Sequence, residues 1–440
     1  MNYLLQRAQK VLENNHKDDF TIPCEGLYPF QWNWDSGFIA IGWAHIDMEK
    51  AMSEVMSLLK GQWLNGFLPH IVFHNESDTY FPGPEVHAAH LSPFSSSQVK
   101  TSGITQPPVL GFVLEYMYDI GKDRDVLIDF LDEVYDAVYS NHEYFYTCRD
   151  PYQEGLVYIC HNWEAGTDNT PVWDLIWETF EVPGYEMNRK DTQLIDASHR
   201  PTNKEYQYYI HLIELFKEWS YSDSKIAQGS PFLIQDPLFN SMLIRSNESL
   251  IRLGALLGKE AAVHQLHLWN RKAKARMNEK LYDNNLKGYV YHDLRNDRTI
   301  GYLSSSSFAP LMAGIPSEAQ ARKMMTHFEE GRFSGSNNEN YLCASFDPTR
   351  PEFNSKKYWR GPIWINLNWI IFQGLLRYGH KKQAATIKKD TLFFMQKYGF
   401  YEYFEPSKHQ NEMLNKGYGG ANFSWSAALT IDLLTNNYNL

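Results

Sequence analysis

Apolar residues recur every three or four positions along most of this chain, which is the spacing of a helix that buries one face. A first helix is predicted by the stripe Ile41, Ala44, Met48, Ala51, Val55 and Leu58. Similar stripes predict helices over residues 124–147, 205–220, 237–257 and 259–280. Gly258 fits a C-terminal cap between the last two, because glycine adopts left-handed backbone angles without strain. In all, the pattern indicates roughly ten to thirteen helices.

The residues from 361 to 398 are the most informative about architecture. Pro362 suits the first turn of a helix, and the stretch IWINLNWIIFQGLL that follows is apolar nearly all round. Such a helix must be buried on most of its faces. Gly379 interrupts the pattern, and residues 380–398 are amphipathic. An inner apolar helix followed by an outer amphipathic one is the unit of two concentric helical rings.

Strand signals are few and short, at residues 286–293 and 398–405. We therefore predict an all-α fold class, an (α/α)6 barrel with short β elements in its loops. One domain over residues 1–440 accommodates this pattern. Long loop or cap insertions are expected around residues 61–106 and 148–200, and long loops within a compact domain tend to carry function.

Composition narrows the class of protein. The chain has 440 residues, and its 41 Lys and Arg against 52 Asp and Glu give a formal net charge of -11. This charge argues against a nucleic-acid binder, which needs a basic face for the phosphates. The 13 Trp, 28 Tyr and 25 Phe amount to 15% of the chain. Aromatic side chains in such number fill a large core or line a cleft for flat ligands such as sugars.

The sequence has none of the usual signals of export or membrane insertion. Its first twenty residues resemble an amphipathic helix, and no apolar run of about 18 residues occurs. The four cysteines, Cys24, Cys148, Cys160 and Cys343, are widely spaced and form no C-x-x-C pair. We therefore predict a cytoplasmic protein with reduced thiols, without a membrane partner or a cofactor. The number of subunits stays open, and a homo-oligomer is compatible with the sequence.

Common cofactor and metal motifs are missing. No P-loop, no G-x-G-x-x-G after a strand, no G-x-S-x-G and no H-E-x-x-H occur. His70 and His74 are four residues apart, and His87 and His90 are three apart, spacings that suit metal binding on a helix. Prolines and a glycine among them indicate a loop instead. We interpret these histidines as structural or substrate-contacting and predict no metal site.

Three parts of the chain combine acidic side chains with several aromatics. They are QWNWDSGF at 31–38, NWEAGTDNTPVWD at 162–174, and YWRGPIWINLNW at 358–369 together with FYEYFEP at 400–406. Aromatic rings stack on the C–H faces of a pyranose, while carboxylates accept its hydroxyls. Hydrolysis of a glycosidic bond needs in addition two carboxyls in different environments, one protonated and one ionised.

Each part also has a purely structural interpretation. Thr170 and Pro171 are good residues for a helix start, so Asp168 can serve a loop turn. FYEYFEP alternates as a strand does, which by itself makes Glu402 an exposed strand residue. WRGPIW is compatible with core packing at the start of a helix. Residue types and spacing alone support a helical carbohydrate-handling protein and leave its activity open.

The order of the motifs adds a resemblance to a known family. QWNWDSGF, SGITQPP, NWEAGTDNTPVWD, YWRGPIWINLNW, and EYFEP followed by NFSWSAA resemble glycoside hydrolase family 63. More narrowly, they resemble its short members, the mannosylglycerate and glucosylglycerate hydrolases, over nearly the whole chain. The resemblance implies an (α/α)6 barrel that cleaves α-glycosides with inversion and needs no metal for the chemistry.

The family's motifs imply roles for ten residues. The general acid would be Asp168, and the general base would be Glu402 rather than Glu405. The pocket for the non-reducing sugar would be formed by Trp34, Asp35, Gln106, Trp163, Trp359 and Trp364. The glycerate end would be bound by Tyr80 and Arg200. A guanidinium suits this last role, because it holds a carboxylate through two parallel hydrogen bonds.

One departure from the family's pattern lies beside the predicted base. Residues 407–420 (SKHQNEMLNKGYGG) stand where the relatives have a shorter stretch built around Thr-Gly. This lengthening bears on the shape of the pocket and therefore on the substrate.

We thus expect an inverting α-glycosidase that hydrolyses a small anionic α-glycoside, such as glucosylglycerate or mannosylglycerate, to a hexose and glycerate. Three alternatives stay open. The first is an α-glucosidase for a neutral disaccharide or oligosaccharide, and the second a sugar epimerase that uses a histidine of the 70–90 loop. The third is a non-catalytic sugar-binding protein. The leading hypothesis requires that Asp168 and Glu402 face one pocket.

Overall fold

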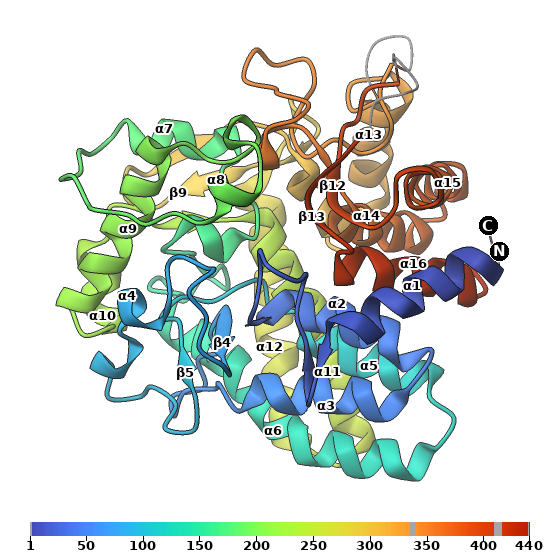
Figure 1. Ribbon diagram of the computed structural model, residues 1–440, viewed down its shortest axis with the longest axis horizontal. Helices are drawn as coiled ribbons and strands as arrows, with labels where there is room; N and C mark the ends of the chain where they lie inside the picture. The colour runs from blue at the N-terminus through green and yellow to red at the C-terminus, as the bar shows by residue number, and fades with distance from the viewer. Residues whose placement is uncertain (1, 335–338, 409–415, 439) are drawn as a thin grey trace.

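The computed structural model describes residues 2–334, 339–408, 416–438 and 440. Most of these residues are helical, with short antiparallel sheets between the helices (Figure 1). The longer helices are α1 (Asn2–Asn15), α2 (Asn33–Ala44), α3 (Met48–Leu59), α5 (Leu110–Ile120), α6 (Arg124–Cys148), α9 (Asn203–Glu218), α11 (Pro237–Leu256), α12 (Glu260–Arg276), α13 (Glu318–Glu329), α14 (Ile365–Arg377), α15 (Lys381–Tyr398) and α16 (Ser424–Thr435). The short helices are α4 (Pro84–His87), α7 (Asp174–Trp177), α8 (Asp191–Leu194) and α10 (Asp223–Gly229), together with the 3-10 segment η6 (Ser305–Leu311).

Among the described residues, six elements bury most of their residues and follow one another around a closed ring. Helix α2 packs on α5, α5 on α11, α11 on η6, η6 on α14, α14 on α16, and α16 again on α2. Helices α1, α3, α6, α12, α13 and α15 bury only one face and lie outside this ring. The predicted inner and outer helices of the 361–398 region are therefore confirmed as α14 and α15. One inner element differs from the expectation, because η6 is a 3-10 segment.

The strands form five small antiparallel sheets. Three of them have three strands, in the orders β3 (Gln31–Trp32), β4 (Ile71–Phe73), β5 (Lys100–Thr101); β11 (Ile363–Trp364), β12 (Tyr401–Phe404), β13 (Gly417–Ala421); and β10 (Arg298–Ile300), β9 (Tyr291–Asp293), β6 (Ile234–Gln235). The other two are the pairs β1 (His16–Lys17) with β2 (Phe20–Thr21) and β7 (Tyr282–Asp283) with β8 (Gly288–Tyr289). Strands β3, β11 and β13 lead directly into α2, α14 and α16, so two of the sheets mark the end of the ring at which these helices begin.

Two sequence predictions about helix ends are wrong. The stripe from Ile41 to Leu58 is divided between α2 and α3, because Asp47 has extended backbone angles and its carboxylate accepts the N–H of Lys50 at 3.2 Å. This side chain caps a new helix, and an apolar stripe cannot reveal such a break. Pro362 does not lie in a first helical turn either, since strand β11 separates it from α14. The predicted cap at Gly258 and the predicted break at Gly379 are confirmed, since both glycines follow a helix end and have φ of +73°.

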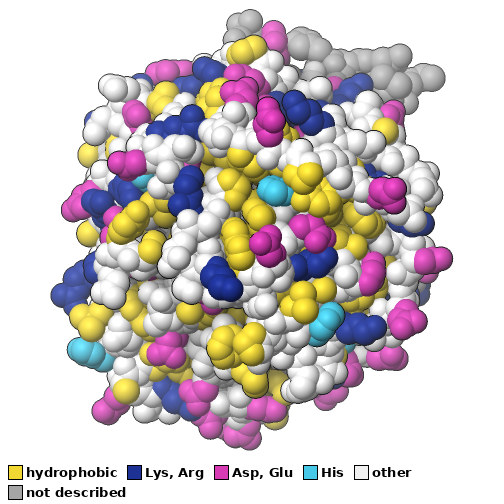
Figure 2. Space-filling view, turned by 90° about the vertical axis from the view of Figure 1, so that its left-hand side faces the viewer, with side chains coloured by type: hydrophobic (Ala, Val, Ile, Leu, Met, Phe, Trp, Pro, Cys, Tyr) yellow, Lys and Arg dark blue, Asp and Glu magenta, His cyan; other side chains and the backbone are white. Residues whose placement is uncertain are grey.

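The surface shows no single-sign charged face in the view of Figure 2, where acidic and basic side chains are interspersed over the side that carries α4, α7, α9 and α10. Among the residues that the structure describes, no helix has the length and apolarity needed to cross a bilayer. The segments 61–106 and 148–200 contain only short strands and short helices, and they lie over the end of the ring where the inner helices begin.

Candidate active site

A cavity of about 740 Å³, its open mouth included, lies where the inner helices begin. Its wall contains all ten residues that the sequence singled out, which are Trp34, Asp35, Tyr80, Gln106, Trp163, Asp168, Arg200, Trp359, Trp364 and Glu402. The structure therefore brings the two predicted acids and the predicted sugar-binding side chains into one enclosure, although more than half of the chain separates the first from the last.

Several of these residues stand at the starts of inner helices. Trp34 and Asp35 lie in the first turn of α2, Gln106 shortly precedes α5, and Trp364 is the residue before α14. The backbone N–H of Trp34 donates to Oε1 of Gln106 at 3.2 Å, which satisfies one of the unpaired N–H groups of a helix start. The partial positive charge of these N-termini favours ligands rich in oxygen.

Tryptophan rings form one wall of the cavity. Trp359 and Trp364 stack at 3.6 Å with their planes 7° apart, and Trp34 meets Trp425 edge to face at 5.9 Å. Gly166 has φ of +70°, and a Cβ at this position would lie 2.6 Å from the Trp34 ring. A side chain at position 166 would therefore collide with the Trp34 ring, so only glycine lets the following turn approach this wall. The wall presents ring faces and edges on which a pyranose can pack.

Asp168 lies in the turn that precedes the 3-10 helix Pro171–Trp173. Its backbone carbonyl accepts the side-chain amide of Asn162 at 2.9 Å, which fixes the turn and leaves the carboxyl directed to the cavity. Enclosure away from bulk water raises the pKa of the Asp168 carboxyl to about 7, and Glu402 acts in the same direction while Arg200 opposes it. At neutral pH a large share of this carboxyl is therefore protonated.

Glu402 is buried in strand β12 with 2% of its surface exposed. The interpretation of this residue as an exposed strand position is wrong, because β13 and the cavity wall cover it. Its Oε1 accepts the hydroxyl of Tyr28 at 2.9 Å, and its Oε2 accepts the backbone N–H of Gly420 at 3.0 Å. Burial raises the pKa of Glu402, while Arg200 and these donors favour its ionised form. Residues 409–415 of the lengthened segment nearby lie outside the described residues.

The cavity wall contains two further carboxyls, Asp35 and Asp191, and 4% of the surface of Asp35 is exposed. Burial raises its pKa well above the ordinary value, and the neighbouring negative charge of Glu402 adds to this effect. A buried carboxyl in a wall of tryptophans can bind sugar hydroxyls as a hydrogen-bond acceptor or donor.

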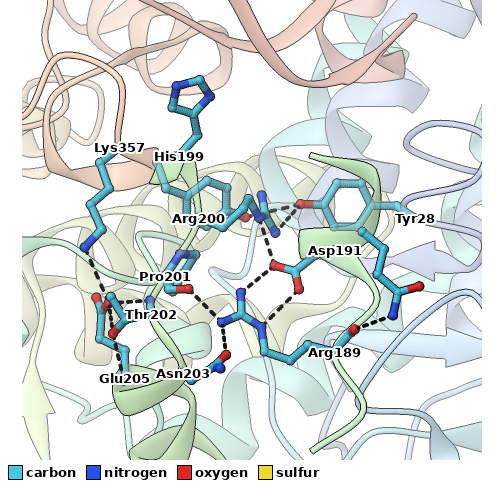
Figure 3. Close-up of polar contacts among 12 residues, drawn as sticks. Tyr28, Arg189, Asp191, His199, Arg200, Pro201, Thr202, Asn203, Glu205 and Lys357 are labelled. Carbon is cyan, nitrogen blue, oxygen red and sulfur yellow. Dashed lines mark hydrogen bonds and ion pairs between the residues drawn. The ribbon is translucent and has the colours of Figure 1, made fainter. Parts of the chain in front are cut away.

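Arg200 is the cation of this enclosure (Figure 3). Its Nε donates to Oδ2 of Asp191 at 3.0 Å, and its Nη2 donates to the hydroxyl of Tyr28 at 3.2 Å. Its guanidinium lies over the ring of Tyr358 at 4.2 Å, and its Nη1 is 3.9 Å from Oε2 of Glu402. Arg200, the predicted binder of an anionic group, therefore also lies close to Glu402, the predicted base.

Trp163 and Tyr80 complete the predicted wall. Trp163 stacks on the ring of His70 with centroids 6.2 Å apart, and Tyr80 meets Trp32 edge to face at 5.2 Å. Of the four histidines considered from the sequence, His70 alone lines the cavity, and burial lowers its pKa well below the ordinary value. Within the described part of the chain, no three His, Cys, Asp or Glu side chains are arranged to hold a metal ion.

Other acids of the same motifs do not reach the cavity. Glu164 is buried against Arg149 at 3.4 Å, and Asp174 forms a bidentate pair with Arg360 at 2.6 and 2.9 Å. Glu405 is half-buried outside the cavity wall. The preference for Asp168 and Glu402 over these three carboxyls therefore agrees with the geometry.

Three polar residues of the site were missed in the sequence. Tyr28 bonds both Glu402 and Arg200. The hydroxyl of Tyr358 lies 3.4 Å from that of Tyr28, and its interaction with Asp168 and Glu402 lowers the pKa of both acids. Asp191 forms the ion pair with Arg200. Tyr358 begins the string YWRGPIWINLNW, which was a signal in the sequence. The segments around Tyr28 and Asp191 carry no such motif.

The geometry suits acid–base chemistry on a small polar ligand. One carboxyl is poised to give a proton, another is held by donors that favour its charge, and both face the same space. Aromatic rings and two further carboxyls surround that space, and a guanidinium stands beside it. General acid and base catalysis at a glycosidic bond needs these groups in this combination.

Comparisons with known proteins point to one family. Residues 28–426 match the family model described as the mannosylglycerate hydrolase MGH1-like glycoside hydrolase domain. A mannosylglycerate hydrolase of Thermus thermophilus is 38% identical over 97% of this chain and 99% of its own. A glucosylglycerate hydrolase of Mycolicibacterium hassiacum is 33% identical over 98% of this chain and 97% of its own.

A solved structure of a relative gives the same result. The family 63 mannosylglycerate hydrolase of Thermus thermophilus, crystallised with Tris and D-glycerate, superposes with a TM-score of 0.90 at 38% identity. The match covers 98% of this chain and 100% of the relative, which was also crystallised with glucose. This chain therefore belongs to glycoside hydrolase family 63, among its mannosylglycerate hydrolase MGH1-like members.

Proposed function

We propose that this protein is an inverting α-glycosidase that hydrolyses a small anionic α-glycoside, of the glucosylglycerate or mannosylglycerate type, to a hexose and glycerate. Asp168 gives its proton to the glycosidic oxygen as the bond to the anomeric carbon breaks. Glu402 takes a proton from the water that attacks this carbon from the opposite face. The released hexose then has the β configuration, and the two carboxyls have exchanged their protonation states.

The observation that carries this proposal is the difference between two carboxyls in one cavity. Asp168 has a pKa of about 7, whereas Glu402 accepts hydrogen bonds from Tyr28 and Gly420 that favour its charge. A general acid must begin protonated and a general base must begin ionised. Asp168 meets the first requirement at neutral pH. Burial raises the pKa of Glu402 as well, while Arg200 and the two donors favour the ionised form that the second requirement needs.

Arg200 supports a carboxylate in the aglycone. It is 4% exposed and lines the cavity, so its charge is available to a ligand and to few water molecules. A buried guanidinium beside the leaving group favours an anionic aglycone, because a charge-assisted pair in such a place is stronger than a neutral hydrogen bond. This is the feature that favours glycerate over the neutral sugar of a disaccharide.

Roles for the remaining wall residues follow. Trp34, Asp35, Gln106, Trp359 and Trp364 bind the hexose, with Trp163 between the two parts of the substrate. Tyr80 and Arg200 bind the glycerate end. We also propose that the closed ring is an (α/α)6 barrel that forms a single catalytic domain over residues 1–440. The substrate is then a cytoplasmic metabolite and no nucleic acid or membrane takes part.

The deciding experiment is a panel of α-glucosides and α-mannosides, each with and without a carboxylate in the aglycone, followed by proton NMR. We expect hydrolysis of the carboxylated glycosides, with the β-hexose as the first anomer to appear. Release of the α-anomer first would contradict inversion. Faster hydrolysis of the neutral glycosides would instead support the alternative of a neutral disaccharide.

A further inference from the structure

The guanidinium of Arg200 is shared between Asp191 and Tyr28 (Figure 3), and it also lies close to Glu402. Its Nε and Nη2 are occupied by Asp191 and Tyr28, at 3.0 and 3.2 Å. Its Nη1 is buried, makes no hydrogen bond to any residue that the structure describes, and lies 3.9 Å from Oε2 of Glu402. A donor in this position can serve a ligand and, at the same time, stabilise the charge of the base.

Asp191 determines how this guanidinium is oriented. Its Oδ2 accepts from Arg200 at 3.0 Å and from Arg189 at 2.8 Å, and Nε of Arg189 donates to its other oxygen at 3.1 Å. Arg189 is held in turn by the carbonyl of Pro201 at 2.8 Å and by the ring of Tyr206, 3.8 Å away. The two guanidiniums keep the pKa of Asp191 below its ordinary value, although burial alone would raise it. Asp191 is therefore a fixed anion on the far side of Arg200 from the base.

We propose that the substrate's own carboxylate, when bound to Arg200, acts electrostatically on Glu402 and Asp168, with Asp191 as the positioning residue that holds the guanidinium between ligand and base. The proposal rests on the function proposed above and adds a consequence to it. The carboxylate then contributes to the chemical step as well as to binding. A neutral substrate of the same shape would lack that contribution.

The direction of the effect follows from Coulomb's law. In the free enzyme Arg200 favours the ionised forms of both Asp168 and Glu402. A bound carboxylate neutralises this influence, so the pKa values of both acids rise, by about one unit for charges several ångströms apart at the effective dielectric of a protein. Asp168 then stays protonated at neutral pH, and the ionised form of Glu402 becomes a stronger base.

Other titratable groups face this cluster from neighbouring elements. They are Cys24, Tyr28, Asp35, Tyr80, Arg189, Asp191, Tyr206, Tyr358 and Tyr403. Burial raises the pKa of the thiol and the phenols above their already high values, so they keep their protons near pH 7. Asp35 is the remaining acid whose pKa is raised by burial, and a nearby anion would raise this pKa further.

The test is the proton balance of ligand binding, which needs no turnover. D-glycerate and its neutral isostere D-glyceramide are titrated into the protein at pH 7 by calorimetry, in buffers of different ionisation enthalpy. D-glycerate should take up about 0.4 proton per site, the value for a group of pKa about 7 that rises by about one unit. D-glyceramide should bind more weakly and take up none. Asp168→Asn should remove most of the uptake.

Variants of the 181–200 segment identify the positioning residue. Asp191→Asn should reduce the proton uptake per bound D-glycerate by at least half, and Asp191→Glu should restore part of it. The matched control is Glu186→Gln, which removes an exposed carboxyl from the same segment and should leave both uptake and affinity unchanged. A general loss of structure would lower the number of binding sites, whereas a positioning role changes the protons taken up at each site.

The outcomes separate this inference from the proposed function. Tight binding of D-glycerate with the same proton balance as D-glyceramide would overturn the electrostatic role and leave Arg200 as an anchor only. Uptake that persists unchanged in Asp191→Asn would overturn the positioning role. Equal affinity for the two ligands would contradict the anionic substrate itself, and with it the function on which the inference rests.

Discussion

Carboxylates at the two ends of the inner helices differ in how completely cations pair with them. Toward the C-terminal ends of α5 and α14, Glu115 is bound by Arg245 and Arg252 at 2.7 and 2.9 Å, and Glu248 by Arg377 at 2.7 Å. Burial alone would raise the pKa of both carboxyls, but these cations hold it below the ordinary value. These acids stay ionised over the whole physiological range, and their pairs join neighbouring helices.

At the end where α2, α14 and α16 begin, the acids have too few cations nearby to balance their charges. Asp168 and Glu402 share the influence of Arg200, which a third acid, Asp191, also binds. The pKa of both cavity acids is raised, above all by burial. The same ring thus carries one set of acids that stabilises it and another set whose incomplete pairing makes proton transfer possible.

The largest expected effect is on the chemical step. Asp168→Asn and Glu402→Gln should each lower kcat for the natural glycoside by about 10³-fold or more, because each removes one partner of the proton transfer. Circular dichroism should show that the fold is retained. Full activity in either variant would remove that residue from the mechanism.

A substrate with a good leaving group separates the two roles. An α-glycosyl fluoride needs little protonation of its leaving group, so Asp168→Asn should hydrolyse it at a rate close to that of the wild type. Glu402→Gln should remain inactive on the fluoride, because the attacking water still needs a base. Equal rescue of both variants would show that the acid and the base were assigned wrongly.

The next effect concerns the charge that the two cavity acids share. Arg200→Ala should raise KM for a carboxylated glycoside by about 10²-fold, the loss of a buried charge-assisted pair of about 3 kcal/mol. A neutral glycoside of the same sugar should be affected far less. Arg252→Ala at the opposite end of the ring is the control, and it should leave KM unchanged for both substrates.

The pH dependence of kcat/KM, which reports the free enzyme, should reflect the raised pKa values. Activity should fall as the pH rises above about 7, because Asp168 then loses the proton that it must donate. It should also fall at acidic pH, as Glu402 becomes protonated and can no longer act as a base. Initial rates from pH 4 to 9 measure both limbs. With the α-glycosyl fluoride the alkaline limb should disappear, and its persistence there would assign that limb to another group.

The smallest effects are on stability, and they should have opposite signs at the two ends. At pH 8 the ionised Asp168 is unfavourable in the folded state, since its pKa is raised from 3.8 to about 7. Asp168→Asn should therefore increase the free energy of unfolding by about 2 kcal/mol at pH 8, and this gain should vanish below pH 4. Urea denaturation at the two pH values measures it.

Glu115→Gln is the counterpart at the stabilising end. Its carboxylate contributes stability above its ordinary pKa, and this stability is lost as the pH falls through the lowered value in the folded state. The substitution should reduce the free energy of unfolding by about 1–3 kcal/mol at pH 7 and leave kcat unchanged. A loss of activity without a loss of stability would contradict the division between the two ends.

The sequence by itself predicted most of the helices, and its motifs singled out Asp168 and Glu402, for which we propose the catalytic roles. Stripes of apolar residues identified α6, α9 and α11, because helical periodicity is a local property that packing preserves. The resemblance of the ordered motifs to family 63 singled out Asp168 and Glu402 as the proposed acid and base, whereas residue types and spacing alone left both roles open.

Only the tertiary structure decided what surrounds those acids. Tyr28 bonds Arg200 across 172 residues, and such a contact leaves no trace in local spacing. Asp191 is only 9 residues from Arg200, but its segment carries no recognisable pattern. The pKa of Asp168 depends on enclosure and on neighbouring charges, which are properties of the assembled cavity. The motifs of the chain therefore single out the two acids, and the assembled cavity determines the pKa of each.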